Sequence, residues 1–221
     1  EELLKDHGKN IQDARIAVSG SGNVAIYAIE KAEQLGAKVI SCSDSSGYII
    51  DENGIDVDAV KQIKEVERKR IKEYLNYHPD ATYGEGSVWD NVICDVALPC
   101  ATQNELNGED AQNLIKNDVL CVGEISNMGC TPEAIDLFIE HKTMYAPGKA
   151  VNAGGVATSD LEMSQNAMHL SWSAAEVDEK LHAIMHGIHA QCVKYGTEPD
   201  GYINYVKGAN IAGFMKVAKA M

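Results

Sequence analysis

Short apolar runs, rich in β-branched residues, alternate with longer amphipathic stretches along the first two thirds of the chain. The runs predict strands at 15–19, 38–43, 92–98, 119–123 and 143–146. Parallel strands need crossover connections, and right-handed crossovers place helices on both faces of a sheet. The pattern therefore predicts an α/β fold with a doubly wound, mostly parallel sheet and helices on both faces.

Two parts of the chain depart from this alternation. The turn signal at 51–54 is followed by a stretch, 57–76, that is rich in Lys, Arg and Glu and predicts one exposed helix. After Ala146 the pattern changes to helical stretches with no strand between them. We therefore expect an excursion from the sheet in the first part and a helical C-terminal segment in the second.

One helix of the C-terminal part has a well-marked start. Ser173 and Glu176 have the spacing of a capping box, and Trp172 and Val177 stand at the positions of a hydrophobic staple. The helix should bury one apolar stripe at helical spacing. That stripe comprises Val177, Leu181, Ile184, Ile188 and Cys192.

Composition narrows the possible partners. The 221 residues include 19 Lys and Arg against 33 Asp and Glu, so the net charge is -14 and repels nucleic acid and anionic membrane surfaces. No apolar run approaches the roughly 20 residues of a bilayer span, and the N-terminus has no signal pattern. We expect a cytoplasmic protein whose anionic ligands need a local site. The cysteines lack CxxC spacing and should be free thiols; they are Cys42, Cys94, Cys100, Cys121, Cys130 and Cys192.

The sharpest motif is a glycine-rich turn, 20–25, between the first strand and a helix that runs to Leu35. Gly20 permits the tight turn, Gly22 lets a pyrophosphate approach the backbone, and Ala25 lets helix and strand pack closely. The helix start offers unpaired N–H groups and a positive dipole end. A turn without a ligand is the alternative, but this placement favours a dinucleotide-binding, Rossmann-type fold.

An acidic residue, Asp44, ends the next strand about twenty residues further on, where such folds bind the adenosine ribose hydroxyls. Taken alone, Asp44 indicates NAD. The neighbouring Ser45 and the basic cluster Arg68, Lys69 and Arg70 could instead accommodate the 2′-phosphate of NADP. The residues themselves leave this choice open.

Five segments, in order, carry a wider resemblance. They are Val18-Ser19-Gly20-Ser21-Gly22-Asn23-Val24-Ala25, Ser43-Asp44-Ser45-Ser46-Gly47, Leu98-Pro99-Cys100-Ala101-Thr102-Gln103-Asn104-Glu105, 146–156 and 208–214. Over almost its whole length the chain resembles the NAD(P)-binding domain of hexameric-type glutamate dehydrogenases. The resemblance implies a lead-in at 1–13, a Rossmann domain at 14–200, and a helical segment at 201–221 that links back to an absent N-terminal catalytic domain.

The resemblance also assigns site residues. The cofactor contacts that it implies, together with those of the turn and Asp44, are Gly20, Ser21, Gly22, Asn23, Val24, Asp44, Ser45, Ala101, Thr102, Gln103, Asn127 and Asn152. Asn152, Val156 and Ser159 would line the substrate pocket. Two departures from the family pattern bear on these contacts: the loop around Asn127 lacks the usual proline, and Asp160 adds a negative charge beside Ser159.

The resemblance implies the reversible oxidative deamination of L-glutamate to 2-oxoglutarate and ammonia with NAD(P). In the resembled family, the sequence Ser43-Asp44-Ser45 favours NADP over NAD by a small margin. The family's acid-base lysine belongs to the preceding domain, so we assign no catalytic residue and no metal here and expect this chain alone to be inactive. The resemblance implies a homohexameric full-length protein, whereas this chain could be a monomer or dimer. The rivals are a leucine-, phenylalanine- or valine-type dehydrogenase domain and a non-catalytic NAD(P)-sensing module.

Overall fold

The computed structural model describes residues 1–12 and 14–221, and Asp13, the last residue of the predicted lead-in, lies outside them. The described chain forms two compact units. The first comprises Glu1 and Leu3–Tyr145, and the second comprises Glu2 and Ala146–Met221. The boundary at residue 200 stays a prediction from sequence.

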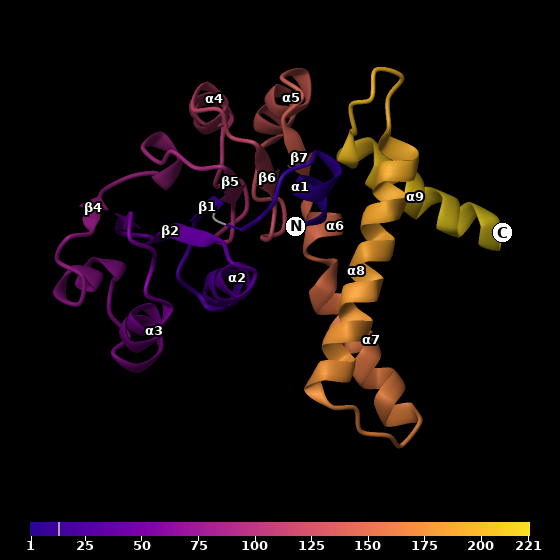
Figure 1. Ribbon diagram of the computed structural model, residues 1–221, viewed down its shortest axis with the longest axis horizontal. Coiled ribbons are helices and arrows are strands. Elements are labelled where there is room, and N and C mark those ends of the chain that lie inside the picture. Colours follow the sequence, from indigo (N-terminus) through magenta and orange to yellow (C-terminus); the bar gives the residue numbers. More distant parts are fainter. Residues whose placement is uncertain (13) are drawn as a thin grey trace. The chain divides into compact units, whose positions relative to one another are not determined.

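The first unit is built on a seven-stranded sheet with the order β4-β3-β2-β1-β5-β6-β7 (Figure 1). The strands are β1 (Arg15–Val18), β2 (Lys38–Asp44), β3 (Gly47–Ile50), β4 (Thr82–Gly84), β5 (Val96–Leu98), β6 (Cys121–Gly123) and β7 (Met144–Ala146). β1 pairs in parallel with both β2 and β5, and β5 pairs in parallel with β6. β3 is antiparallel to both β2 and β4.

The five predicted strands are present, and the mostly parallel sheet is confirmed. Sequence reasoning placed the start of β5 at residue 92, whereas the strand begins at Val96. It missed β3 and β4 altogether. Because a tight turn follows Asp44, the chain folds back as an antiparallel hairpin and extends the sheet at the edge beyond β2. The apolar run Tyr48-Ile49-Ile50 forms this added strand.

Helices cover both faces of the sheet. In the first unit they are α1 (Glu2–Asp6), α2 (Asn23–Gln34), α3 (Val57–Lys61), α4 (Gly108–Lys116) and α5 (Pro132–Glu140), with a π-helix η1 (Gln62–Val66) and 3-10 helices η2 (Ile71–Asn76) and η3 (Val88–Asp90). α2 connects β1 to β2, whereas α4 and α5 connect the strands on the other side of β1. Figure 1 shows α2 and α3 on one side of the sheet and α4 and α5 on the other, so the doubly wound arrangement is confirmed.

The prediction of one exposed helix at 57–76 was wrong. The segment is divided into α3, η1 and η2, and Arg68 between the last two has a φ of 54°, which no helix accommodates. It is not wholly exposed either, since Ile63, Ile71 and Tyr74 are completely buried. These apolar side chains hold the segment against the sheet, and two of its charged residues, Lys64 and Arg70, lie beside the end of β2.

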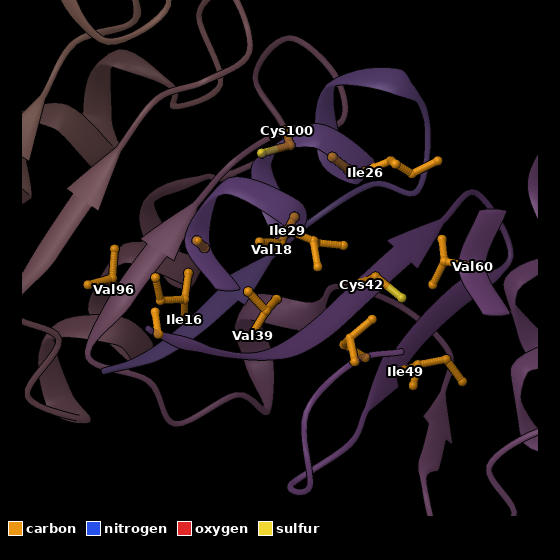
Figure 2. Packing of buried hydrophobic residues seen from close by; sticks show 14 of the residues in the cluster. Ile16, Val18, Ile26, Ile29, Val39, Cys42, Ile49, Val60, Val96 and Cys100 are labelled. Carbon is orange, nitrogen blue, oxygen red and sulfur yellow. The ribbon is translucent and has the colours of Figure 1, made fainter. Parts of the chain in front are cut away.

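The core of the first unit fixes the start of α2 over β1. Figure 2 shows Ile16 and Val18 of β1 packed with Ile26 and Ile29 of α2 and Val39 of β2, and each of these side chains is at most 2% exposed. Burial of a side chain of this size stabilises the fold by about 1.5–3 kcal/mol. The glycine-rich turn between β1 and α2 is thus anchored at both of its ends.

The second unit consists of four helices among the described residues: α6 (Gly148–Val151), α7 (Ala153–Ala167), α8 (Ala174–Gly196) and α9 (Tyr205–Ala220). The predicted capping box at the start of α8 is confirmed. The backbone N–H of Glu176 donates to Ser173 Oγ at 3.3 Å, and the N–H of Ser173 donates to the Glu176 carboxylate at 2.7 Å. Along the predicted stripe of α8, Cys192 is buried and the other members are partly buried.

The sequence predicted free cysteines and no membrane-spanning segment. All six cysteines are free thiols, and all of them are buried. No helix among the described residues is both long enough and apolar enough to cross a bilayer.

The helices α8 and α9 approach each other at two glycines. A Cβ added to Gly208 would overlap the carbonyl oxygen of Cys192, and one added to Gly196 would overlap the carbonyl oxygen of Asn204. Both obstacles are backbone atoms, which cannot move away as a flexible side chain can. The absence of side chains at these positions is therefore a condition for the packing of the two helices.

We predict that Gly208→Ala lowers the free energy of unfolding by about 1–3 kcal/mol, because the added methyl group forces the helices apart. Gly213→Ala is the matched control on the same helix, since a Cβ there meets no atom within 4 Å. It should be neutral or stabilise the protein by up to about 1 kcal/mol through helix propensity. Urea unfolding followed by circular dichroism measures both. Equal effects of the two substitutions would contradict the close approach.

Candidate functional site

A hollow of about 470 Å³ opens at the ends of β1, β2 and β5 in the first unit. From β1 the chain continues to β2 on one side, whereas β5 lies on its other side. In open α/β sheets, ligands bind at the carboxyl ends of the strands where the strand order diverges in this way. The lining residues are Gly20, Ser21, Gly22, Asn23, Val24, Ser43, Asp44, Ser45, Lys64, Arg70, Cys100 and Ala101.

The turn after β1 brings the chain very close to the end of β5. Gly20 has a φ of 81°, and a Cβ there would lie 3.2 Å from both the carbonyl oxygen of Cys100 and the Cα of Ala101. Glycine is required on both counts. The N–H of Gly20 donates to Ser43 Oγ at 2.8 Å, and the N–H of Ser43 donates to the Gly20 carbonyl at 3.0 Å. The turn is thereby fixed to β2 as well.

The first turn of α2 presents uncapped N–H groups to the hollow. Gly22 is the N-cap residue and supplies no side-chain hydrogen bond, so the first N–H groups of this 12-residue helix have no partner within it. A Cβ added to Gly22 would meet no atom within 4 Å, whereas Ala25, one turn on, is completely buried. This combination of open backbone and positive helix end suits an anionic ligand such as a pyrophosphate.

Asp44, at the end of β2, is the centre of a dense hydrogen-bond network. One carboxylate oxygen accepts from the N–H of Ser46 at 2.8 Å and from its hydroxyl at 2.6 Å. The other accepts from Lys64 Nζ and from the N–H of Ile71, both at 2.8 Å. Burial opposes ionisation of Asp44, but the hydrogen bonds from Lys64, Ser46 and Ile71 prevail and lower its pKa to about 2.

Two cations stand beside this carboxylate and line the hollow. Lys64 comes from the π-helix η1 and pairs with Asp44, and Arg70 donates to the hydroxyl of Ser45. Of the basic cluster predicted from sequence, only Arg70 lines the hollow; Lys69 pairs with Glu67 at 3.0 Å instead. Sequence reasoning did not select Lys64, because its position depends on a π-helix that periodicity does not reveal.

The predicted nicotinamide-side residues lie on two loops that the structure joins. Thr102 and Gln103, in the turn after β5, and Asn127, in the loop after β6, are exposed and do not line the hollow, whereas Ala101 does. The N–H of Asn104 donates to the Met128 carbonyl at 2.7 Å. The two loops therefore form one continuous rim beyond the end of β5.

The loop after β6 is held by a buried carboxylate. Glu124 is 3% exposed, and its carboxylate accepts the N–H of Cys130 at 2.8 Å. The carbonyl of Pro99 accepts the N–H groups of Ile125 and Ser126 at 3.1 and 2.9 Å. These bonds constrain the loop that lacks the family's usual proline, and the sequence gives no sign of them.

The remaining predicted residues lie in the second unit. Asn152 separates α6 from α7, and Val156 and Ser159 are exposed on α7, as is the neighbouring Asp160. Val156 is 69% exposed, so its apolar side chain is available for contact. Lys149 donates to the amide oxygen of Asn210 at 2.7 Å. The assignment of Asn152, Val156 and Ser159 to a substrate pocket stays a prediction.

Taken together, the divergent strands, the glycine turn and the uncapped helix define the class of the protein, an α/β domain of the dinucleotide-binding type. The model of the family described as Glutamate/Leucine/Phenylalanine/Valine dehydrogenase matches residues 1–221. The chain belongs to this family.

Several relatives are similar over the whole chain. The NAD-specific glutamate dehydrogenase of Bacteroides fragilis is 68% identical over 100% of this chain and 50% of its own length. The NADP-specific glutamate dehydrogenase of Salmonella typhi is 53% identical with the same coverage of 100% and 50%. The solved structure of Plasmodium falciparum glutamate dehydrogenase 2 has a TM-score of 0.94 at 44% identity and covers 99% of this chain and 49% of its own. The chain thus spans about half the length of these relatives.

The network around Asp44 predicts a pH-dependent stability. Because the pKa of Asp44 is lowered from 3.8 to about 2, its ionised form stabilises the fold at pH values above 4, and this contribution disappears as the pH falls through 2. Asp44→Asn should therefore cost about 2 kcal/mol of unfolding free energy at pH 7, and the difference from the wild type should shrink towards pH 2.

Urea unfolding at pH 7, 4 and 2.5 measures this difference. Asp80→Asn is the control, since Asp80 is exposed and is not among the residues that line the hollow. It should leave the stability unchanged at every pH. A constant effect of Asp44→Asn across the pH range would contradict the account of the network.

Proposed function

We propose that the first unit binds NAD or NADP in the hollow at the ends of β1, β2 and β5. The observation that carries the proposal is the uncapped start of α2, where Gly22 leaves the backbone open to a pyrophosphate. The adenosine ribose would lie beside Asp44 and Ser45. The nicotinamide half would extend past Ala101 towards the rim that carries Thr102, Gln103 and Asn127.

The contacts of Asp44 support NADP over NAD by a small margin. The carboxylate of Asp44 already accepts four hydrogen bonds from the protein, so little acceptor capacity is left for ribose hydroxyls. Arg70 and the hydroxyl of Ser45 can both donate to a 2′-phosphate, and Lys64 compensates the charge of Asp44. The relatives' names include NAD-specific and NADP-specific enzymes and do not decide the choice.

We propose that the whole protein catalyses the reversible oxidative deamination of L-glutamate to 2-oxoglutarate and ammonia. Two of its relatives are named glutamate dehydrogenases, one of them NAD-specific. When bound, the dinucleotide supplies a nicotinamide ring that accepts a hydride. Asn152, Val156 and Ser159 are the residues of this chain that would contact the amino acid. The lysine that serves as acid and base in the resembled family belongs to the half that these 221 residues do not include, so the chain alone should not turn over.

The assembly state and the cellular location of the protein are also proposals. The resemblance supports a homohexamer for the full-length protein and a monomer or dimer for this chain. Six buried free thiols are consistent with a reducing compartment, and we place the protein in the cytoplasm on this ground.

Parallel titrations with NADPH and NADH at one ionic strength, followed by nicotinamide fluorescence, test the proposal. The wild type should bind both and prefer NADPH. Arg70→Ala should weaken NADPH binding about tenfold, because a charge-assisted hydrogen bond to the 2′-phosphate is lost, and should change NADH binding less than about twofold.

Lys69→Ala is the matched control, because it removes an adjacent positive charge that does not line the hollow. It should affect the two cofactors equally and weakly. Binding of neither cofactor to the wild type would refute the proposed function. An equal loss of both in Arg70→Ala would refute the assignment of Arg70 to the 2′-phosphate.

A further inference from the structure

Glu105 closes the turn that carries Ala101, Thr102 and Gln103 and is itself partly buried. Its carboxylate accepts the N–H of Ala101 at 2.8 Å. The N–H of Thr102 and the side chains of Ser19 and Trp89 also approach the carboxylate and, as donors, favour its ionised form. Trp89 is 1% exposed and Ser19 is 2% exposed, so both donors are removed from water.

Every partner of this carboxylate is a donor. Backbone N–H groups and the indole N–H of Trp89 can only donate. The hydroxyl of Ser19 accepts the N–H of Cys100 at 2.9 Å, which leaves its own proton to be donated to Glu105. Only an ionised carboxylate satisfies all four groups, since a protonated acid or an amide would direct a donor at a donor.

These bonds connect two parts of the site that are distant in sequence. Ser19 immediately precedes Gly20, where even an added Cβ would lie only 3.2 Å from the backbone of Cys100 and Ala101. Glu105 therefore ties the end of β1, where the glycine-rich turn begins, to the turn that follows β5. In that turn the backbone N–H groups point to Glu105, while the side chains of Ala101, Thr102 and Gln103 remain exposed.

We propose that Glu105 is a positioning residue. It holds the turn 100–104 against the glycine-rich turn, so that the exposed side chains of the turn 100–104 meet the nicotinamide half of the dinucleotide. Glu105 acts through the backbone of Ala101 and Thr102 and does not touch the cofactor. The inference rests on the proposed cofactor binding and adds a division of labour. The adenosine half is held by Asp44 and its neighbours, whereas the nicotinamide half depends on Glu105.

The test uses Glu105→Gln in this chain and two ligands, NADPH and its adenosine half, 2′,5′-ADP. If NADH proves the tighter ligand of the wild type, NADH and ADP replace them. The variant should raise the Kd of the dinucleotide about tenfold, as expected for mispairing of a buried hydrogen-bonded charge, and change the Kd of the fragment less than about twofold. Glu109→Gln is the control, because it makes the same chemical change at an exposed residue in the first turn of α4.

The pH profile separates positioning from a merely structural role. Burial raises the pKa of Glu105 above its ordinary value, and the thiols that face it, Cys100 and Cys130, are uncharged because burial raises their pKa values as well. As the pH is lowered through the pKa of Glu105, the ratio of dinucleotide Kd to fragment Kd should rise in the wild type. The wild-type ratio divided by the ratio for Glu105→Gln should therefore rise as the pH falls. Titration of the ligands' phosphates cancels in this comparison, because both proteins are measured with the same two ligands.

The outcomes distinguish the two proposals. Failure of the wild type to bind either ligand refutes the proposed function. Binding of both ligands by the wild type, with no selective loss of the dinucleotide in Glu105→Gln, overturns the role of Glu105 alone. If circular dichroism shows that Glu105→Gln does not fold, Trp89→Phe keeps the aromatic ring and removes one donor. It should weaken only the dinucleotide, about threefold, and an unchanged Kd overturns the inference.

Discussion

The structure of the site depends on one close approach, that of Gly20 to the backbone of Cys100 and Ala101. A side chain at Gly20 would push the ends of β1 and β5 apart, and its positive φ would be strained in any other residue. The approach directs the chain from β1 into α2 with the helix start facing the hollow. It also brings Ser19 within reach of Cys100 and Glu105, so the glycine-rich turn and the turn after β5 are linked directly.

The proposed dinucleotide is an anion, whereas the chain has a net charge of -14. The hollow offers three local features that would attract an anion: the uncapped N–H groups of α2, the guanidinium of Arg70, and Lys64, which offsets the carboxylate of Asp44. Short-range hydrogen bonds of this kind act in partly desolvated surroundings, where they outweigh the screened repulsion of distant surface charges. The acidic surface and the anion site are therefore compatible.

The elements that periodicity and local motifs specify were predictable from sequence. β1, β2, the glycine turn and the capping box of α8 follow from short-range patterns, and the structure contains them as expected. The antiparallel strands β3 and β4 were not predictable, because their pairing is decided by a turn and by distant partners. The break at Arg68 and the π-helix that positions Lys64 also escape periodicity.

The candidate site likewise contains residues that could be predicted from the sequence and residues that could not. The sequence and the resemblance selected Gly20, Gly22 and Asp44, which the structure brings together around one hollow. They did not select Glu105 or Glu124, whose importance lies in hydrogen bonds to backbone groups that only the folded chain brings near. Acceptors for loop N–H groups have no periodic signature, so their roles become visible only in three dimensions.

Amide chemical-shift mapping by NMR during a titration with NADPH tests the central claim most directly, because it reports the binding place residue by residue. The largest changes should occur at the amides of 21–24, at Ser45 and in the turn 100–104. The groove between α8 and α9, lined by residues such as Ile188 and Ala212, should show no change. Changes confined to that groove, or none at 21–24, would contradict the assignment of the glycine turn as the pyrophosphate site.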